Sequence, residues 1–199
     1  MIEKQAVDRE KALLIGVIRP GMTDNIIHEH LDELELLADT AGAEVVGRVT
    51  QKVSRINAAT FLGKGKAQQV IDQASALGVS LILFDDELSP AQIKNYHQMS
   101  QGTKILDRSG LILNIFQKHA RTKEARTQVD LAYLEYLLPR LTRQWTHLER
   151  QMGGIGTRAG AGETQIEIDR RLIRNQIAKL KRELTSIEKQ RKVQNHRRV

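Results

Sequence analysis

The chain has 199 residues, of which 40% are hydrophobic and 28% are charged, and it contains no cysteine. These fractions suffice for a folded core and exclude an intrinsically disordered chain, and no apolar run approaches the ~18 residues of a membrane helix. The lack of cysteine excludes disulfides, thiolate catalysis and cysteine-ligated zinc. Together with a polar N-terminus that has no signal peptide, it predicts a cytoplasmic protein.

The formal net charge of +7 is unevenly distributed along the chain. Residues 1–117 contain 12 Lys and Arg against 15 Asp and Glu, whereas residues 118–199 contain 19 against 9. A basic C-terminal part on a mildly acidic body indicates a polyanionic partner, most simply a nucleic acid. A solvated charged helix surface is the alternative.

The first half alternates short apolar runs with helical patterns, which predicts strands over 12–18, 43–53, 79–84 and 103–106. Helices are expected over 24–41, over 64–77 and from residue 90 onward. Thr23 or Asp24 can cap the first helix and Gly42 can end it, while Ser89, Pro90 and Gln92 form a capping box. Strand–helix alternation is typical of α/β proteins. We expect residues 1–112 to form a small, mostly parallel four-stranded sheet flanked by helices.

The second half predicts two long amphipathic helices, over 119–150 and 163–191, whose apolar residues recur every three or four positions. Pro139 should kink the first helix, and Thr164 with Glu167 forms a capping box for the second. Two such helices in sequence pack antiparallel. We therefore expect a long, coiled-coil-like α-helical hairpin over 113–192 with a glycine-rich tip at 151–163, followed by a basic linker at 193–199.

The predicted tip has the chemistry of an anion site, because five of the 14 glycines lie between 153 and 162. Glycine lets backbone N–H groups approach a ligand closely, and arginines surround the loop. We expect this tip to bind folded RNA, although a mobile loop without a ligand is the alternative. The candidate RNA-binding residues are Arg143, Arg150, Gly153, Gly154, Gly156, Arg158, Gly160, Gly162, Arg170, Arg171 and Arg174.

Weaker patterns lie in the first half. Gly63, Lys64, Gly65 and Lys66 precede a predicted helix and could hold a phosphate, although a plain turn is the more common explanation. Asp85 and Asp86 follow a predicted strand, where a carboxylate could hold Mg²⁺ or a ribose, although loop solvation is more common. We predict no metal site and no catalytic residues, because the histidines are scattered and no nucleophile–base set is recognisable.

Several stretches of the chain resemble the HflX family of ribosome-associated GTPases. They are 61-FLGKGK-66, 85-DDELSPAQ-92, 107-DRSGLILNIFQKHARTKEARTQVDLAYLEYLLPRL-141 and 153-GGIGTRAGAGETQIEIDRRLIRNQIAKLKREL-184. The glycine-rich loop departs from the usual family sequence, because it lacks a proline and is one residue longer. No Gly-x-x-x-x-Gly-Lys-Ser/Thr sequence occurs in the 199 residues.

The resemblance implies that this chain is the N-terminal region of such a GTPase. A C-terminal GTPase domain that uses GTP and Mg²⁺ would follow it, and this chain alone would not hydrolyse GTP. The implied partners are the 50S ribosomal subunit and its 23S rRNA, which the hairpin tip would contact while the whole protein splits stalled ribosomes. A monomer is expected. The alternatives are a tRNA-binding arm and an ATP-binding α/β domain that uses Gly63, Lys64, Gly65, Lys66 and Asp85.

Overall fold

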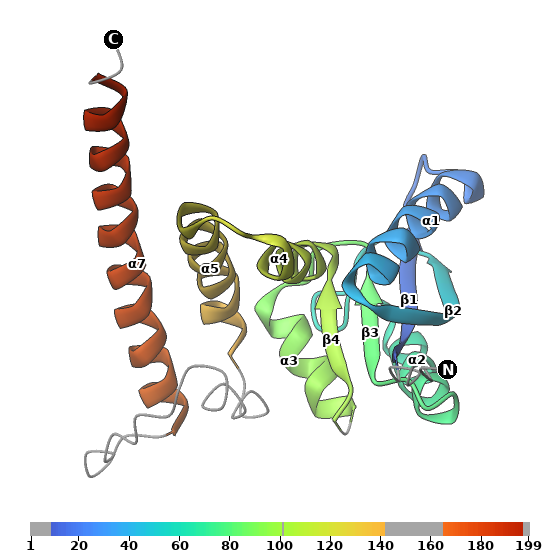
Figure 1. Ribbon diagram of the computed structural model, residues 1–199. Helices are drawn as coiled ribbons and strands as arrows, with labels where there is room; N and C mark the ends of the chain where they lie inside the picture. Colours follow the sequence, from blue (N-terminus) through green and yellow to red (C-terminus); the bar gives the residue numbers. More distant parts are fainter. Residues whose placement is uncertain (1–8, 101, 142–164, 197–199) are drawn as a thin grey trace, which may run out of the picture. The chain divides into compact units, whose positions relative to one another are not determined.

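The computed structural model describes residues 9–100, 102–141 and 165–196. The chain divides into two compact units, with the boundary between Ile115 and Phe116. The elements of the first unit alternate between strand and helix along the chain (Figure 1). They are β1 (Glu10–Ile18), α1 (Asp24–Ala41), β2 (Ala43–Lys52), α2 (Lys64–Ala76), β3 (Leu81–Phe84), α3 (Pro90–Met99), β4 (Lys104–Asp107) and the start of α4 (Arg108–His119).

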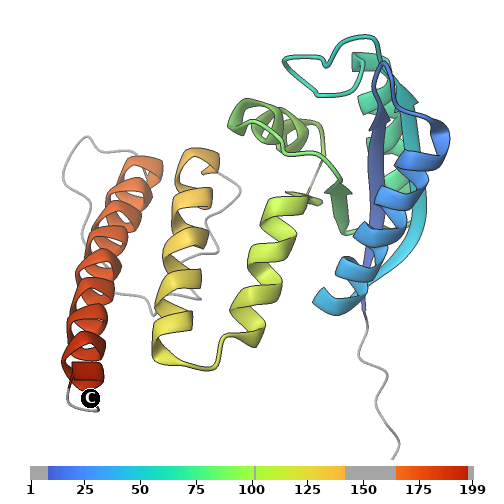
Figure 2. The same ribbon diagram turned by 90° about the horizontal axis from the view of Figure 1, so that it is seen from above.

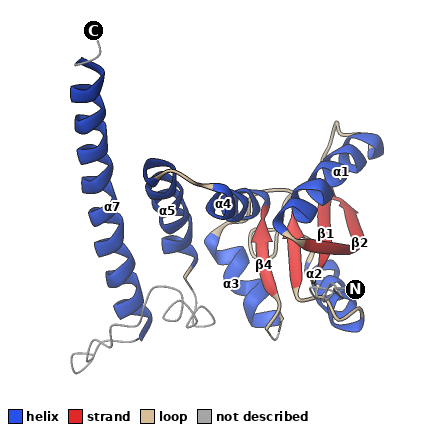
Figure 3. Cartoon of the chain, viewed as in Figure 1, coloured by secondary structure: helices blue, strands red, loops and turns tan. Residues whose placement is uncertain are grey.

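The described strands form a four-stranded sheet in the order β2-β1-β3-β4, and every neighbouring pair is parallel. The α/β fold class with four parallel strands is therefore confirmed (Figure 3). β2 lies on one side of β1, whereas β3 and β4 lie on the other side. The gap between β1 and β3 is therefore the topological switch point of the sheet. This switch point is where ligands bind in open α/β sheets.

The sheet separates two apolar clusters because alternate residues of a strand point to opposite faces. On one face, Ala12 and Leu14 of β1 pack with Ile27 and Leu31 of α1. On the other face, Leu13 and Ile15 pack with residues of α2 and α3. The continuous apolar run of β1 is thus explained, because both of its faces are covered.

Three predicted helix ends lie where they were expected, although one lacks the expected capping hydrogen bond. Gly42 ends α1 in the left-handed conformation, with φ 91°. Ser89 and Gln92 form the complete capping box at the start of α3, and Pro90 occupies the first turn. Thr23 is the N-cap residue of α1, but its side chain makes no capping hydrogen bond.

The second unit contains α5 (Lys123–Leu137), a short 3-10 helix (Leu138–Arg140) and α7 (Gln165–His196). The predicted helix over 119–150 is confirmed over α5, but it starts later than predicted and ends at Leu137. α4 ends at His119, and Thr122 starts a new helix because its side chain accepts a hydrogen bond from Ala125 N at 3.1 Å. Pro139 lies in the 3-10 helix, since proline cannot donate the backbone hydrogen bond that would continue α5. Residues 142–150 lie outside the described residues.

α5 and α7 pack side by side and run in opposite directions (Figures 1 and 2). Glu124 near the start of α5 pairs with Arg191 near the end of α7, at 2.9 Å. Between the helices, an apolar cluster contains Leu134, Leu137, Leu141, Ile173 and Leu180. The long hairpin predicted from the sequence extends beyond this pair, and its tip at 151–163, with the Thr164 cap, lies outside the described residues. It stays a prediction.

Candidate functional site

The surface of α7 that faces away from α5 carries a row of basic side chains. Leu180 and Ile173 are buried against α5, and the opposite face of α7 is exposed. We define the α7 basic stripe as the exposed lysine and arginine residues of that face that recur at helical spacing. Its members are Arg171, Arg174, Arg182 and Lys189.

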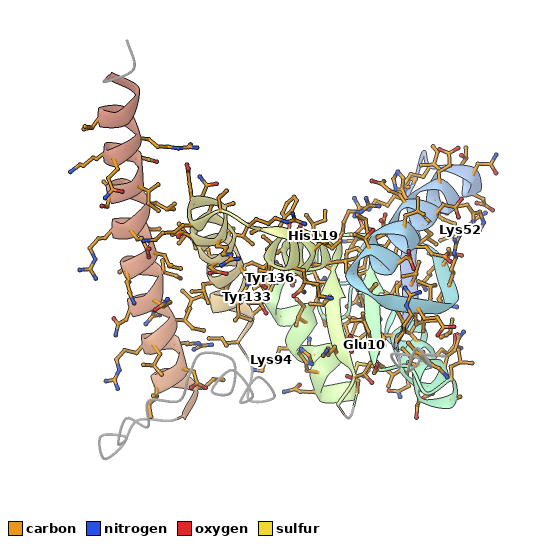
Figure 4. The ribbon with its side chains drawn as sticks, viewed as in Figure 1. Glu10, Lys52, Lys94, His119, Tyr133 and Tyr136 are labelled. Atoms are coloured by element: carbon orange, nitrogen blue, oxygen red, sulfur yellow. The ribbon has the colours of Figure 1, made fainter. Side chains whose placement is uncertain are left out.

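The α7 basic stripe is about 27 Å long, because its ends are 18 residues apart along the helix. Other basic residues of α7 pair with acidic residues of α5, since Lys181 Nζ lies 2.8 Å from Glu135 and Arg191 pairs with Glu124. Nitrogen-tipped side chains extend from α7 on the side away from α5 (Figure 4). One side of α7 therefore forms ion pairs with α5, and the other side exposes a row of basic side chains.

The residues predicted to bind RNA fall into two groups. Arg170, Arg171 and Arg174 lie in the first turns of α7, and Arg171 and Arg174 belong to the basic stripe. The members of the predicted set between residues 143 and 162 lie outside the described residues. Arg182 and Lys189 were missed, although the spacing from Arg174 to Arg182 and Lys189 places them on the same face of a helix.

A pocket of about 300 Å³ lies at the carboxyl ends of β1 and β3. Val17, Met22 and Ile27 supply its apolar lining. The charged and polar lining consists of Arg19, His30, Glu33, Asp85, Asp86 and Arg108. We call this pocket the switch-point crevice, because it sits where the strand order reverses.

Asp85 is the buried anion of the switch-point crevice, with a side chain that is 8% exposed. Its Oδ1 accepts a hydrogen bond from Arg108 Nε at 3.0 Å, and its Oδ2 lies 3.3 Å from His30 Nδ1. The expectation of a solvated loop is wrong for Asp85, because side chains from α1 and α4 cover it. Neighbouring Asp86 pairs with Arg19, and burial raises the pKa of Asp86 more than Arg19 lowers it.

The structure does not bring Asp85 together with the glycine–lysine sequence. Gly63 precedes α2 and donates its N–H to Gln51 Oε1 at 3.1 Å, and Lys64 and Lys66 lie in the first turn of α2. α2 packs on the opposite face of the sheet from α1, whereas the partners of Asp85 come from α1 and α4. The glycine–lysine turn before α2 and the crevice around Asp85 are therefore separate, although the sequence analysis placed their residues in one nucleotide site.

Among the described residues, no group of three histidine, aspartate or glutamate side chains could hold a metal ion. No described helix is both long and apolar enough to span a membrane.

Two family models together match most of the chain. Residues 28–117 match the N-terminal region of the GTP-binding GTPases, and residues 119–198 match their middle region. The chain is also 50% identical over 194 residues to the GTPase HflX of Flavobacterium psychrophilum. The chain belongs to the HflX family. The HflX of Escherichia coli is 44% identical to it over 182 residues.

This HflX-family chain covers less than half of its relatives' length. It spans 46% of the Flavobacterium psychrophilum protein and 42% of the Escherichia coli protein, which match 98% and 92% of this chain. Among solved structures, SsGBP in complex with GDP matches 92% of the chain with a TM-score of 0.66 and 23% identity, and the chain covers 45% of it. At 23% identity, this match shows that the two chains share a fold and carries no argument about function.

Proposed function

We propose that this chain is the part of an HflX-type GTPase that binds the large ribosomal subunit, through contacts with its 23S rRNA. The whole protein would hydrolyse GTP and split stalled ribosomes in the cytoplasm. The observation that carries the proposal is the α7 basic stripe on a second unit that is far more basic than the first. Cationic rows of this kind bind nucleic-acid phosphates without reading sequence.

The sequence contains no phosphate-binding Gly-x-x-x-x-Gly-Lys-Ser/Thr loop, and the described residues hold no metal-binding cluster. In this proposal GTP and Mg²⁺ act in a GTPase domain outside this sequence, which would also be a partner of the two units. The role proposed for this chain is to recognise the large ribosomal subunit, and we expect it to act as a monomer.

The proposed tip at 151–163 would extend the cationic surface of α7. Its glycines would leave backbone N–H groups accessible, and its sequence contains Arg158 and follows Arg143 and Arg150. Because A-form RNA is recognised mainly through shape, phosphates and 2′-hydroxyls, a narrow hairpin end suits a cleft in folded rRNA.

The first prediction tests the tip. Replacing Arg150 and Arg158 by Ala should weaken cosedimentation with 50S subunits and lower the slope of log affinity against log salt by about two units, one for each lost phosphate contact. A slope equal to that of the unchanged protein would contradict a role for the tip. Tighter binding to tRNA than to 50S subunits would favour the tRNA-arm alternative.

A second candidate function is the binding of a nucleotide such as ATP in the switch-point crevice. The observation in its favour is a pocket with arginine, histidine and carboxylate side chains at the point where ligands bind in open α/β sheets. We expect labelled ATP to bind saturably, and Arg19→Ala to weaken binding more than Lys64→Ala does. Titration by fluorescence anisotropy measures both, and the absence of saturable binding would remove this candidate.

A further inference from the structure

One guanidinium group in the switch-point crevice connects three elements of the first unit. Arg108, the first residue of α4, donates from Nε to Asp85 at the end of β3 at 3.0 Å. Its Nη1 lies 3.0 Å from Glu33 Oε2 on α1, and its Nη2 donates to the backbone carbonyl of His30 at 3.2 Å. Because a guanidinium is planar and permanently charged, it can satisfy these acceptors together in one fixed orientation.

The acceptors of Arg108 differ in their exposure to water. Asp85 is almost fully buried, whereas the Glu33 side chain is 64% exposed and that of Arg108 is 25% exposed. His30 approaches the second oxygen of Asp85, and the Arg19–Asp86 pair lines the same crevice. The cluster thus has a buried ionic centre and an open side that solvent can enter.

α4 is attached to the first unit by both apolar and polar contacts. Leu111 belongs to the apolar cluster on the α1 side of the sheet and Ile115 packs against it, whereas Phe116 is 53% exposed. Asp107 accepts hydrogen bonds from Gly110 N at 2.9 Å and from Leu88 N at 3.1 Å. The first turn of α4, which precedes Leu111, is therefore held to the sheet by the polar contacts of Asp107 and Arg108.

The position of α4 in the chain makes this attachment consequential. The boundary between the two compact units lies between Ile115 and Phe116, within α4. Any loosening of the first turns of α4 changes the connection between the units, because the chain passes from one to the other through this helix.

We infer that Arg108 is a releasable clamp that holds the start of α4 to α1 and β3 and so controls how firmly the connecting helix is docked on the first unit. Release would loosen the first turn of α4 while the sheet stays folded, because the apolar cluster that contains Leu111 does not depend on the Arg108 side chain. This inference does not depend on RNA binding.

Hydrogen exchange of the full chain tests the clamp. In Arg108→Met, peptides covering 109–119 should exchange at least about tenfold faster, while those of β1 and β3 stay protected. In the unchanged protein, opening of α4 must break the Arg108 ion pairs, and in the variant it does not. Arg48→Met is the matched control. Arg48 extends from β2 to Asp32 at 2.6 Å and to Glu35 at 3.1 Å, so it also clamps α1 through two carboxylates but does not touch α4.

The expected exchange of α4 in Arg48→Met is within about twofold of the unchanged protein. Glu33→Gln, which keeps the Arg108–Asp85 pair, should give an intermediate rate and serves if Arg108→Met does not fold. Unchanged α4 exchange in both Arg108→Met and Glu33→Gln, or equal acceleration by Arg48→Met, would overturn the inference.

Discussion

Replacing Asp107 by Ala should lower the free energy of unfolding of the first unit by about 3 kcal/mol, because the loss of a helix cap adds to the loss of a buried hydrogen-bond acceptor. Asp107 is 0% exposed, and its two carboxylate oxygens accept from Gly110 N and Leu88 N. Alanine would leave both N–H groups buried without that partner. Few single substitutions outside the apolar core should cost this unit more.

The measurement for Asp107→Ala is the hydrogen exchange of the slowest β1 and β3 amides, which reports the stability of the first unit separately from the second. Thr122→Ala is the control, because Thr122 also caps a helix but its side chain accepts a single hydrogen bond, from Ala125 N, at an exposed site. Thr122 belongs to the second unit, so its cost is read from the slowest amides of α5. Its expected cost is about 1 kcal/mol. Equal costs for the two substitutions would show that burial of the Asp107 carboxylate adds nothing.

Reversing two charges of the α7 basic stripe should weaken binding to 50S subunits more than any other surface change in the described chain. For Arg174→Glu with Arg182→Glu, we expect affinity at low salt to fall about 100-fold, because two attractions to phosphate become repulsions. Both side chains are exposed, so the α5–α7 apolar cluster should remain packed. Cosedimentation across a salt series measures the loss.

The matched control for this reversal is Lys11→Glu with Lys94→Glu. These lysines are exposed on the first unit, and the double substitution changes the net charge by the same amount. We expect it to lower affinity by less than about fivefold, through long-range electrostatics alone. Equal losses in the two double variants would mean that net charge, and not the stripe, determines binding.

The sheet and several helix ends were predictable because their signals are local. The run 12–18 is apolar throughout, which indicates a strand covered on both faces, and Ser89 with Gln92 determines the start of α3 within four residues. Gly42 ends α1 for an equally local reason, since glycine adopts a positive φ without strain.

The helix α4 was not predicted, and the following helix was expected to start at residue 119 and not at Lys123. Residues 119–122 contain neither glycine nor proline to mark the gap, and the side chains that cap the two helices are Asp107 for α4 and Thr122 for α5. Apolar periodicity identifies the face of a helix but not where a side chain replaces the backbone hydrogen bond.

The partners of the switch-point crevice were hidden for a different reason. His30, Asp85 and Arg108 lie far apart in the sequence and meet only after β1 and β3 pair. The sequence placed Asp85 at the end of a strand but could not show which cation would neutralise it. It also paired Asp85 with Lys64 and Lys66, because the side of the sheet that each helix covers depends on strand order.

Site-specific photocrosslinking to intact 50S subunits tests the central claim most directly. A crosslinkable residue placed at position 182 of the α7 basic stripe should react with 23S rRNA at low salt, and the product should disappear as salt rises. The same residue at position 94 on α3 should give no rRNA product. Crosslinks from position 94 but not from position 182 would contradict the account, because the acidic first unit and not α7 would then face the RNA.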